Sequence, residues 1–264
     1  MHKITRFHAS SYEGWGLIDG DAIHELDNPW SGKRGRSHPL SGVRLLAACA
    51  PSKIVGVGRN YREHAKELGN EVPSEPLIFL KPPSSLIASG DSIVYPATSQ
   101  NVHYEGELGV VIGVRARHVT AAEAENYIFG YTCVNDVTAR DLQRKDVQFT
   151  RAKGFDTFCP AGPWIVRRED VVLENLRVRT LLDGEVRQDA SVRDMIFPVS
   201  AIIAFVTQFM TLEPGDLIAT GTPSGVGPMQ IGSTVSVEID GIGTLQNRVV
   251  AAIRAASSQG EINR

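Results

Sequence analysis

This sequence lacks the usual features of secreted, membrane-bound and nucleic-acid-binding proteins. No apolar run approaches the ~18 residues of a membrane span, and the N-terminal segment MHKITRFHASSYEGWG lacks the apolar core of a secretory signal. The formal net charge is only -3, and neither acidic nor basic residues form a long run. This balance gives no reason to expect nucleic acid or an anionic membrane as a partner. We therefore expect a cytoplasmic protein that binds a small molecule.

Cysteine is also scarce. Cys49, Cys133 and Cys159 lie far apart in the chain, and no CxxC pair is present. An odd and scattered set predicts neither a disulfide framework nor a thiolate zinc site. We expect all three thiols to be buried and reduced.

The glycine-rich motifs of nucleotide-binding proteins are incomplete in this chain. In GVGRNY, Tyr61 stands where the dinucleotide motif needs its third glycine, and GTPSGVG lacks the Gly-Lys-Ser/Thr ending of a phosphate loop. A GxSxG motif, which would indicate a serine hydrolase of the α/β type, is missing too. The sequence thus argues against nucleotide sites and against that hydrolase class.

What the sequence contains is a series of short apolar runs with the character of strands. A chain of 264 residues suits one large domain with a small appendage. We predict a small β-rich N-terminal domain over residues 1–50 and a catalytic domain over 51–264, with a mainly β (α+β) fold. The expected strands are 3–7, 15–20, 22–26, 54–57, 77–80, 105–114, 128–134, 176–182 and 234–239, with Asp-Gly turns at 19–20, 183–184 and 240–241.

Few segments have the character of a helix. Residues 120–127 open with a capping box of Thr120 and Glu123. Residues 199–210 form the one clearly helical apolar segment. The polar stretch 28–39 is expected to interrupt the strands. This balance disfavours a doubly wound βαβ array.

Two glutamates stand close together in the segment HYEGELGVVIG. Residues two apart on a strand share a face, so Glu105 and Glu107 project side by side with Cα atoms roughly 6.7 Å apart. Two like charges at that spacing repel by about 2 to 3 kcal/mol at an effective dielectric of about 20. A divalent cation would offset this repulsion. The alternative is a solvated strand end with both acids in water.

A third carboxylate ends the next apolar strand. The segment YTCVNDVTARDLQ becomes polar at Asp136, and a short helical stretch follows. An aspartate in this position can simply cap a helix. From these residues alone, a cap and a metal ligand both remain open.

Five motifs in a fixed order resemble the fumarylacetoacetate hydrolase family. They are GRNYREHAKE at 58–67, the E-x-E strand, NDVTARD, KGFDTFCPAGP from Lys153, and TGTPSGVG from Thr220. The resemblance covers about residues 55–249. It implies a mixed β-roll or sandwich catalytic domain with short helices, a dimer, and Mg2+ or Mn2+ held by Glu105, Glu107 and Asp136.

The resemblance also implies roles for residues around the metal. Lys153 matches a lysine that holds the substrate's oxygen; without this context it would be a surface charge. Arg140 and Gln143, on one face of a short helix, match substrate-contacting positions, although a surface salt bridge is the alternative for Arg140. Thr222 matches a pocket-closing loop, which could equally be an ordinary glycine-rich turn.

His64 and Glu67 are the candidates for proton transfer. Their spacing of three places both side chains on one face of a helix, where the carboxylate can orient the imidazole as a general base. Such pairs are often solvated surface residues, but the match to the family's lid segment implies a catalytic dyad. We expect residues 60–75 to order over the metal when a ligand binds. His103 shares the face of the glutamates but is not a ligand in the family pattern.

These residues imply an enzyme that acts on 2-oxo acids through an enolate bound to the metal. The leading expectation is hydrolysis of the C–C bond of acylpyruvates, in which water activated by His64 attacks the 4-oxo group. Two alternatives use the same enolate: oxaloacetate decarboxylation or tautomerisation, and isomerisation of 2-hydroxymuconate or 2-hydroxyhepta-2,4-diene-1,7-dioate diacids. A relative that binds metal without turnover is the alternative outside enzymes.

Overall fold

The computed structural model describes residues 1–252 except residues 11, 31 and 70. In this part of the chain, strands dominate and form three sheets, while the α-helices are short. Parallel pairing among the described strands is limited to β6 with β17, β8 with β14 and β9 with β20. The predicted mainly β (α+β) fold is therefore confirmed.

The largest sheet joins the N-terminal strands to the centre of the molecule. The junction is β1, whose Lys3 and Ile4 pair with Val166 and Ile165 of β14. The domain boundary near residue 50 stays a prediction. In spatial order the sheet contains β4 (Arg34–Pro39), β3 (Ala22–Leu26), β2 (Tyr12–Asp19), β1 (Lys3–Ala9), β14 (Cys159–Arg167), β12 (Ile128–Asn135), β11 (Gly106–Ile112), β17 (Leu217–Ala219), β6 (Ile54–Gly58) and β7 (Leu77–Lys81), with β5 (Arg44–Leu45) beside β1 and β8 (Leu86–Ile87) beside β14.

Two smaller sheets complete the β structure. The turn at Asp183 and Gly184 has φ of 53° and 85°, the two positive values that a type I′ hairpin requires. This predicted turn and the one at 240–241 both join hairpin strands, as expected. The sheets are β16 (Glu185–Ser191), β15 (Arg177–Leu182), β19 (Thr234–Ile239), β20 (Gly243–Ala251) and β9 (Ser92–Tyr95), and β13 (Thr138–Ala139), β10 (Val102–Tyr104) and β18 (Gly227–Pro228).

The central strands β11 and β12 are buried along their whole length. Leu108 and Val110 pack in one cluster with Val237 of the second sheet and Ile203 of α4. Val111, on the opposite face, belongs to a cluster that reaches the N-terminal strands. Burial on both faces explains why this segment is continuously apolar rather than alternating.

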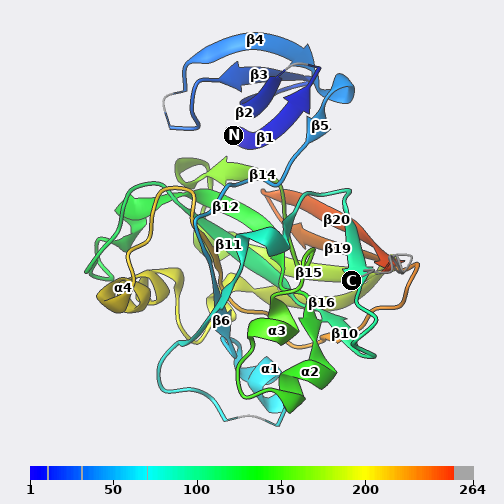
Figure 1. Cartoon of the computed structure of the whole chain (residues 1–264). Helices are drawn as coiled ribbons and strands as arrows, with labels where there is room; N and C mark the ends of the chain where they lie inside the picture. Colours follow the sequence, from blue (N-terminus) through cyan, green and yellow to red (C-terminus); the bar gives the residue numbers. More distant parts are fainter. Residues whose placement is uncertain (11, 31, 70, 253–264) are drawn as a thin grey trace, which may run out of the picture.

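The α-helices lie in two places around the sheets. In Figure 1, α1, α2 and α3 gather at the end of the molecule far from the N-terminal strands, and α4 lies to one side. The apolar helix predicted at 199–210 is confirmed as α4. The bounds are α1 (Arg62–Glu67), α2 (Arg140–Lys145), α3 (Thr150–Lys153) and α4 (Val199–Phe209).

Two local predictions need correction. The polar stretch 28–39 contains a strand, β4, which pairs with β3 through Ile23 and His38. Because β4 is a mostly exposed edge strand, its backbone pairs while its side chains show no apolar alternation. At 120–127 the Glu123 carboxylate does accept a hydrogen bond from Thr120 N at 3.3 Å. Only a 3-10 helix over Ala124–Tyr127 follows, since β12 begins at once.

The three cysteines are buried and their thiols are free, as predicted. Among the described residues, none of the helices combines the length and apolarity needed to cross a membrane.

The buried Asp216 links the segments that lead into β6 and β17. Asp216 Oδ1 accepts hydrogen bonds from Ser52 N at 2.9 Å, Ser52 Oγ at 2.7 Å and Lys53 N at 3.1 Å. Its Oδ2 accepts from Glu213 N at 2.7 Å and from Lys53 Nζ at 2.5 Å. The side chain is fully buried. Asp216 thereby sets the register of two strands whose far ends lead into the site.

Asp216→Ala should lower the free energy of unfolding by about 3 to 5 kcal/mol, because it leaves several backbone N–H groups and the half-buried Lys53 ammonium without their acceptor. Urea denaturation measures the change. The exposed Asp156 side chain makes no hydrogen bond or ion pair with the described residues, so Asp156→Ala should shift stability by less than about 0.5 kcal/mol. Equal stability of the two variants would contradict the role of Asp216.

Candidate active site

Three buried carboxylates meet where β11 begins and β12 ends. Gly106 pairs with Asn135 across the two strands, so the flanking residues Glu105, Glu107 and Asp136 come together. One carboxylate oxygen from each lies within 4.8 Å of the others. The structure thus brings together the three residues that were predicted as metal ligands.

Gly106 lets the two glutamates approach the second sheet closely. A Cβ atom at this position would lie 1.9 Å from Thr180 Oγ1 of β15, closer than any side chain permits. The Gly106 N–H donates to Gln188 Oε1 at 3.0 Å. A glycine between the glutamates is therefore required by packing.

Backbone contacts fix each carboxylate in place. Glu105 N donates to Asn135 Oδ1 at 3.0 Å, and Asp136 N donates to Glu105 O at 2.9 Å. Glu107 Oε2 accepts from Gly221 N at 2.8 Å. Gly221 has φ of 99°, which favours glycine. The predicted TGTP loop therefore supports a candidate ligand directly.

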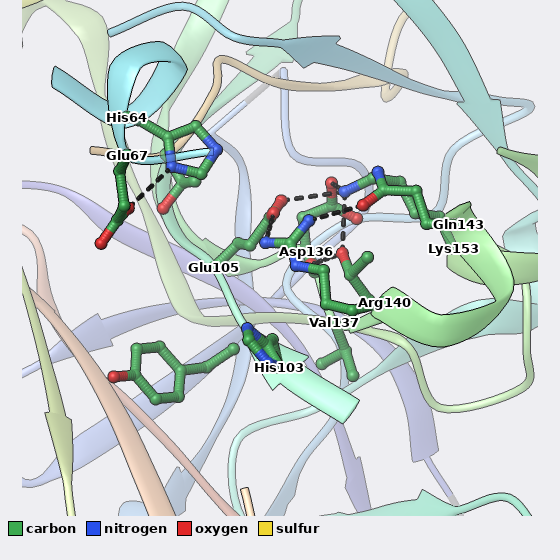
Figure 2. A network of polar contacts seen from close by, with 12 residues as sticks. His64, Glu67, His103, Glu105, Asp136, Val137, Arg140, Gln143 and Lys153 are labelled. Carbon is green, nitrogen blue, oxygen red and sulfur yellow. Dashed lines mark hydrogen bonds and ion pairs between the residues drawn. The ribbon is translucent and has the colours of Figure 1, made fainter. Parts of the chain in front are cut away.

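Three cations surround these carboxylates. Lys153 Nζ lies 2.9 Å from Glu105 Oε2 and 2.5 Å from Asp136 Oδ2. Arg140 contacts Glu105 Oε1 through Nη2, and Lys81 Nζ lies 2.5 Å from Asp136 Oδ1. Figure 2 shows Lys153 and Arg140 converging on Glu105 and Asp136. Burying this many charges is tolerable only because they are paired.

The environment shifts the pKa values in opposite directions. Burial raises the pKa of Glu107 well above its ordinary value, and the charges of Asp136 and Glu105 raise it further. Burial would also raise the pKa of Glu105, but Arg140 and Lys153 outweigh it and hold that pKa well below its usual range. Burial opposes the charge on Lys153, yet Asp136 and Glu105 raise its pKa. Lys153 therefore stays an ammonium.

The donor set fits a hard metal ion. Glu105, Glu107 and Asp136 supply only oxygen ligands, the type that hard divalent cations prefer. Glu107 Oε1 receives no hydrogen bond from the described residues. The mutual repulsion that raises the pKa of Glu107 is what a cation would relieve. The trio can therefore hold a metal ion.

His64 and Glu67 lie on one face of α1, as predicted. His64 Nδ1 and Glu67 Oε2 are 3.4 Å apart, and Figure 2 shows the pair beside Glu105. His64 is buried and lines the same cavity as the carboxylates. Glu67 Oε1 also accepts from Gly225 N at 3.0 Å, which fastens α1 over the site. The helix expected in segment 60–75 is present; its opening without ligand stays a prediction.

The predicted substrate-contacting residues also line the cavity. Arg140 Nη1 donates to Gln143 Oε1 at 2.8 Å, so both lie on one face of α2. Arg140 is 4% exposed, which does not fit a surface salt bridge. The Thr222 hydroxyl donates to Gly106 O at 2.9 Å and accepts from Gln188 Nε2 at 2.8 Å. It thus braces the segment between the glutamates.

The cavity has a volume of about 250 Å³ and combines a charged end with apolar walls. Phe79 of β7 and Phe149 face each other edge to face, with ring centroids 5.9 Å apart. Further lining residues are Val57, Gly58, Arg59, Leu68, Leu77 and Arg144. The space can accept a small organic acid.

Lys81 was missed in the sequence. It ends an apolar strand, before two prolines, and is 1% exposed while contacting Asp136. A single charge at the end of such a strand is the signal that could have identified it. His103, which was left out of the predicted ligand set, faces Asn101, with Nε2 2.8 Å from Asn101 Oδ1.

Comparison with known proteins agrees with this geometry. Residues 53–250 match the fumarylacetoacetate (FAA) hydrolase C-terminal family, and residues 2–47 match the Rv2993c-like N-terminal family. Protein Rv2993c of Mycobacterium tuberculosis is 52% identical over 82% of each chain. Oxaloacetate tautomerase YisK of Bacillus subtilis is 43% identical, over 80% of this chain and 75% of its own.

The similarity extends to solved structures. The crystal structure of 5-carboxymethyl-2-hydroxymuconate delta-isomerase from Mycobacterium smegmatis superposes with a TM-score of 0.89, at 43% identity over 95% of this chain and 100% of that chain. The matched region contains all three carboxylates and the residues around them. The chain therefore belongs to the fumarylacetoacetate hydrolase family.

Proposed function

We propose that this protein is a Mg2+- or Mn2+-dependent enzyme that forms an enolate from a 2-oxo acid. The observation that carries the proposal is the buried trio of Glu105, Glu107 and Asp136 with Lys153 beside it, in one cavity with His64. The three side chains would hold the ion. When bound, the ion would supply Lewis-acid stabilisation of the negative charge developing on the substrate's keto oxygen.

Lys153 and Arg140 bind and orient the anionic end of the substrate. Lys153 remains protonated because Asp136 and Glu105 raise its pKa despite burial. Its ammonium is fixed in place, so it stabilises the negative charge that develops on the substrate without any reorganisation of water. Gln143 holds the Arg140 guanidinium through Nη1, so this donor is preorganised as well.

His64 is suited to remove a proton. Burial lowers its pKa, although Glu105 and Glu67 act in the opposite direction. The imidazole is therefore neutral near pH 7 and can accept a proton from C3 of a 2-oxo acid or from water. Glu67 orients the ring through Nδ1.

Two reactions share this machinery. The name of the Bacillus subtilis relative favours oxaloacetate tautomerisation, in which a proton leaves C3 and another is added to the keto oxygen. The pair of buried His64 and its partner Glu67 favours hydrolysis of an acylpyruvate, in which water adds at C4 and the C3–C4 bond breaks to release pyruvate. We place oxaloacetate first, because the relative that bears this name is 43% identical.

Purified protein with Mg2+ should accelerate the loss of the enol absorbance of oxaloacetate, because the site stabilises the enolate that links enol and keto forms. Acetylpyruvate and a 2-hydroxymuconate diacid are assayed beside it, with pyruvate release as the mark of hydrolysis. Removal of the ion with EDTA should abolish the acceleration. If none of the three substrates turns over, the chain is a binding protein and the proposed enzyme function fails.

Glu107→Gln should weaken Mn2+ binding more than about tenfold, since even loss of a residue that only supports a ligand costs that much. Isothermal titration calorimetry measures the affinity, and thermal unfolding checks the fold. Glu174→Gln, at an exposed position, removes the same charge and should leave the affinity unchanged. Unaltered Mn2+ binding by the Glu107 variant would remove Glu107 from the ligand set.

Lys153→Met should lower kcat about 100-fold, the scale of losing one preorganised donor to an oxyanion. Mn2+ binding should persist because the three carboxylates remain. Lys145→Met is the matched control, because Lys145 is exposed at the end of α2. Normal turnover by the Lys153 variant would show that its ammonium only neutralises the carboxylates.

A further inference from the structure

Two arginines that line the cavity make no hydrogen bond or ion pair with the described residues. Arg59 and Arg144 line the space that the carboxylates enclose. In the described part of the chain, neither guanidinium makes a hydrogen bond or ion pair. Arg140, only four residues before Arg144, by contrast contacts Glu105 and Gln143. Unpaired arginines in a substrate cavity are available for a ligand.

Arg59 is held at the cavity by an unusual backbone conformation. It follows the last residue of β6 and has φ of 56°, a left-handed value that is strained for a residue with a side chain. The next residue, Asn60, is buried and fixed by hydrogen bonds to Thr220 O at 2.7 Å and Phe197 O at 3.0 Å. The fold therefore maintains strain where Arg59 enters the cavity.

Arg144 lies one helical turn beyond the carboxylates. Residues four apart share a helix face, so Arg140 and Arg144 both point toward the cavity from α2. Arg140 contacts Glu105. Arg144 is displaced from it by about 5.4 Å along the helix axis, and it is exposed. It therefore lies toward the outer end of the cavity.

The charge balance indicates what these arginines bind. Lys81, Lys153 and Arg140 match the three carboxylates in number of charges, and they contact Glu105 and Asp136 directly. The charge of a bound divalent ion and of the two free arginines is thus left for the substrate. A guanidinium matches a carboxylate in geometry as well as in charge.

Part of the cavity wall is apolar. Phe79, Phe149 and Leu77 belong to the lining. Such a surface suits the carbon chain of a substrate that carries polar groups at both ends. The cavity therefore combines the carboxylate trio, apolar walls and a second cationic group.

We propose that Arg59 and Arg144 form a distal carboxylate site, which gives the enzyme its preference for dicarboxylic over monocarboxylic 2-oxo acids. The inference rests on the proposed function, because the metal end must hold the 2-oxo acid group. It assigns specificity to residues outside the carboxylate trio and the His64–Glu67 pair.

The test measures binding rather than turnover. 2-Oxoglutarate and 2-oxopentanoate have the same chain length and the same 2-oxo acid end, and only the first carries a distal carboxylate. Calorimetry with Mg2+ should show 2-oxoglutarate binding roughly tenfold or more tightly, the scale of one charge-assisted pair. Oxalate, which can engage only the metal end, reports on that end alone.

Arg59→Gln and Arg144→Gln should each reduce this preference, and the double variant should bring the two affinities close together. Oxalate affinity should stay unchanged in all three. Arg62→Gln is the matched control, because Arg62 is an exposed arginine on α1 and is not among the residues that line the cavity. Thermal unfolding checks the Arg59 variant for loss of fold, and the Arg144 variant tests the site independently.

Each outcome separates the two proposals. Equal binding of 2-oxoglutarate and 2-oxopentanoate by the unaltered protein would overturn the distal site, while Mg2+-dependent oxalate binding would still support the metal end. A preference that survives in the double variant would assign the distal carboxylate to other residues and overturn the inference. Absence of Mg2+-dependent oxalate binding by the unaltered protein would instead refute the proposed function itself.

Discussion

The structure depends on keeping three carboxylates together in a buried place. Glu105, Glu107 and Asp136 lie within a few ångströms of one another and away from water. Each charge removed from water costs several kcal/mol, and like charges add to that cost. Positive charge must therefore be supplied by the surrounding chain, and a metal ion held by the three carboxylates would add to it. Much of the architecture around the site can be understood as meeting this requirement.

The compensating cations come from separate parts of the chain. Lys81 ends β7, Arg140 begins α2, and Lys153 ends α3. Strands β11 and β12 are buried on both faces, so the carboxylates at their ends are held in fixed positions. The three other elements place the cations beside these carboxylates. The positions of the charges therefore persist through a reaction, which is the basis of electrostatic preorganisation.

The same arrangement explains how one family can support several reactions. By our proposal, a metal ion held by the carboxylate trio would stabilise an enolate together with Lys153, whichever bond is broken to form it. The proton acceptor and the group that binds the far end of the substrate are separate from this centre. In this chain we propose His64 for the first task, and we infer Arg59 and Arg144 for the second. Specificity is thus separable from the shared chemistry.

The sequence by itself determined the strand-rich fold, most strand positions and the candidate ligands, because apolar runs, Asp-Gly turns and motif order are local features. It predicted that His64 and Glu67 share a helix face, since helical periodicity requires it. Only the tertiary structure placed Lys81 against Asp136, 55 residues away. The tertiary structure was also needed to show that Arg59 lines the cavity and makes no hydrogen bond or ion pair with the described residues. Such contacts depend on which strands and loops meet in space, and no periodicity along the chain encodes that.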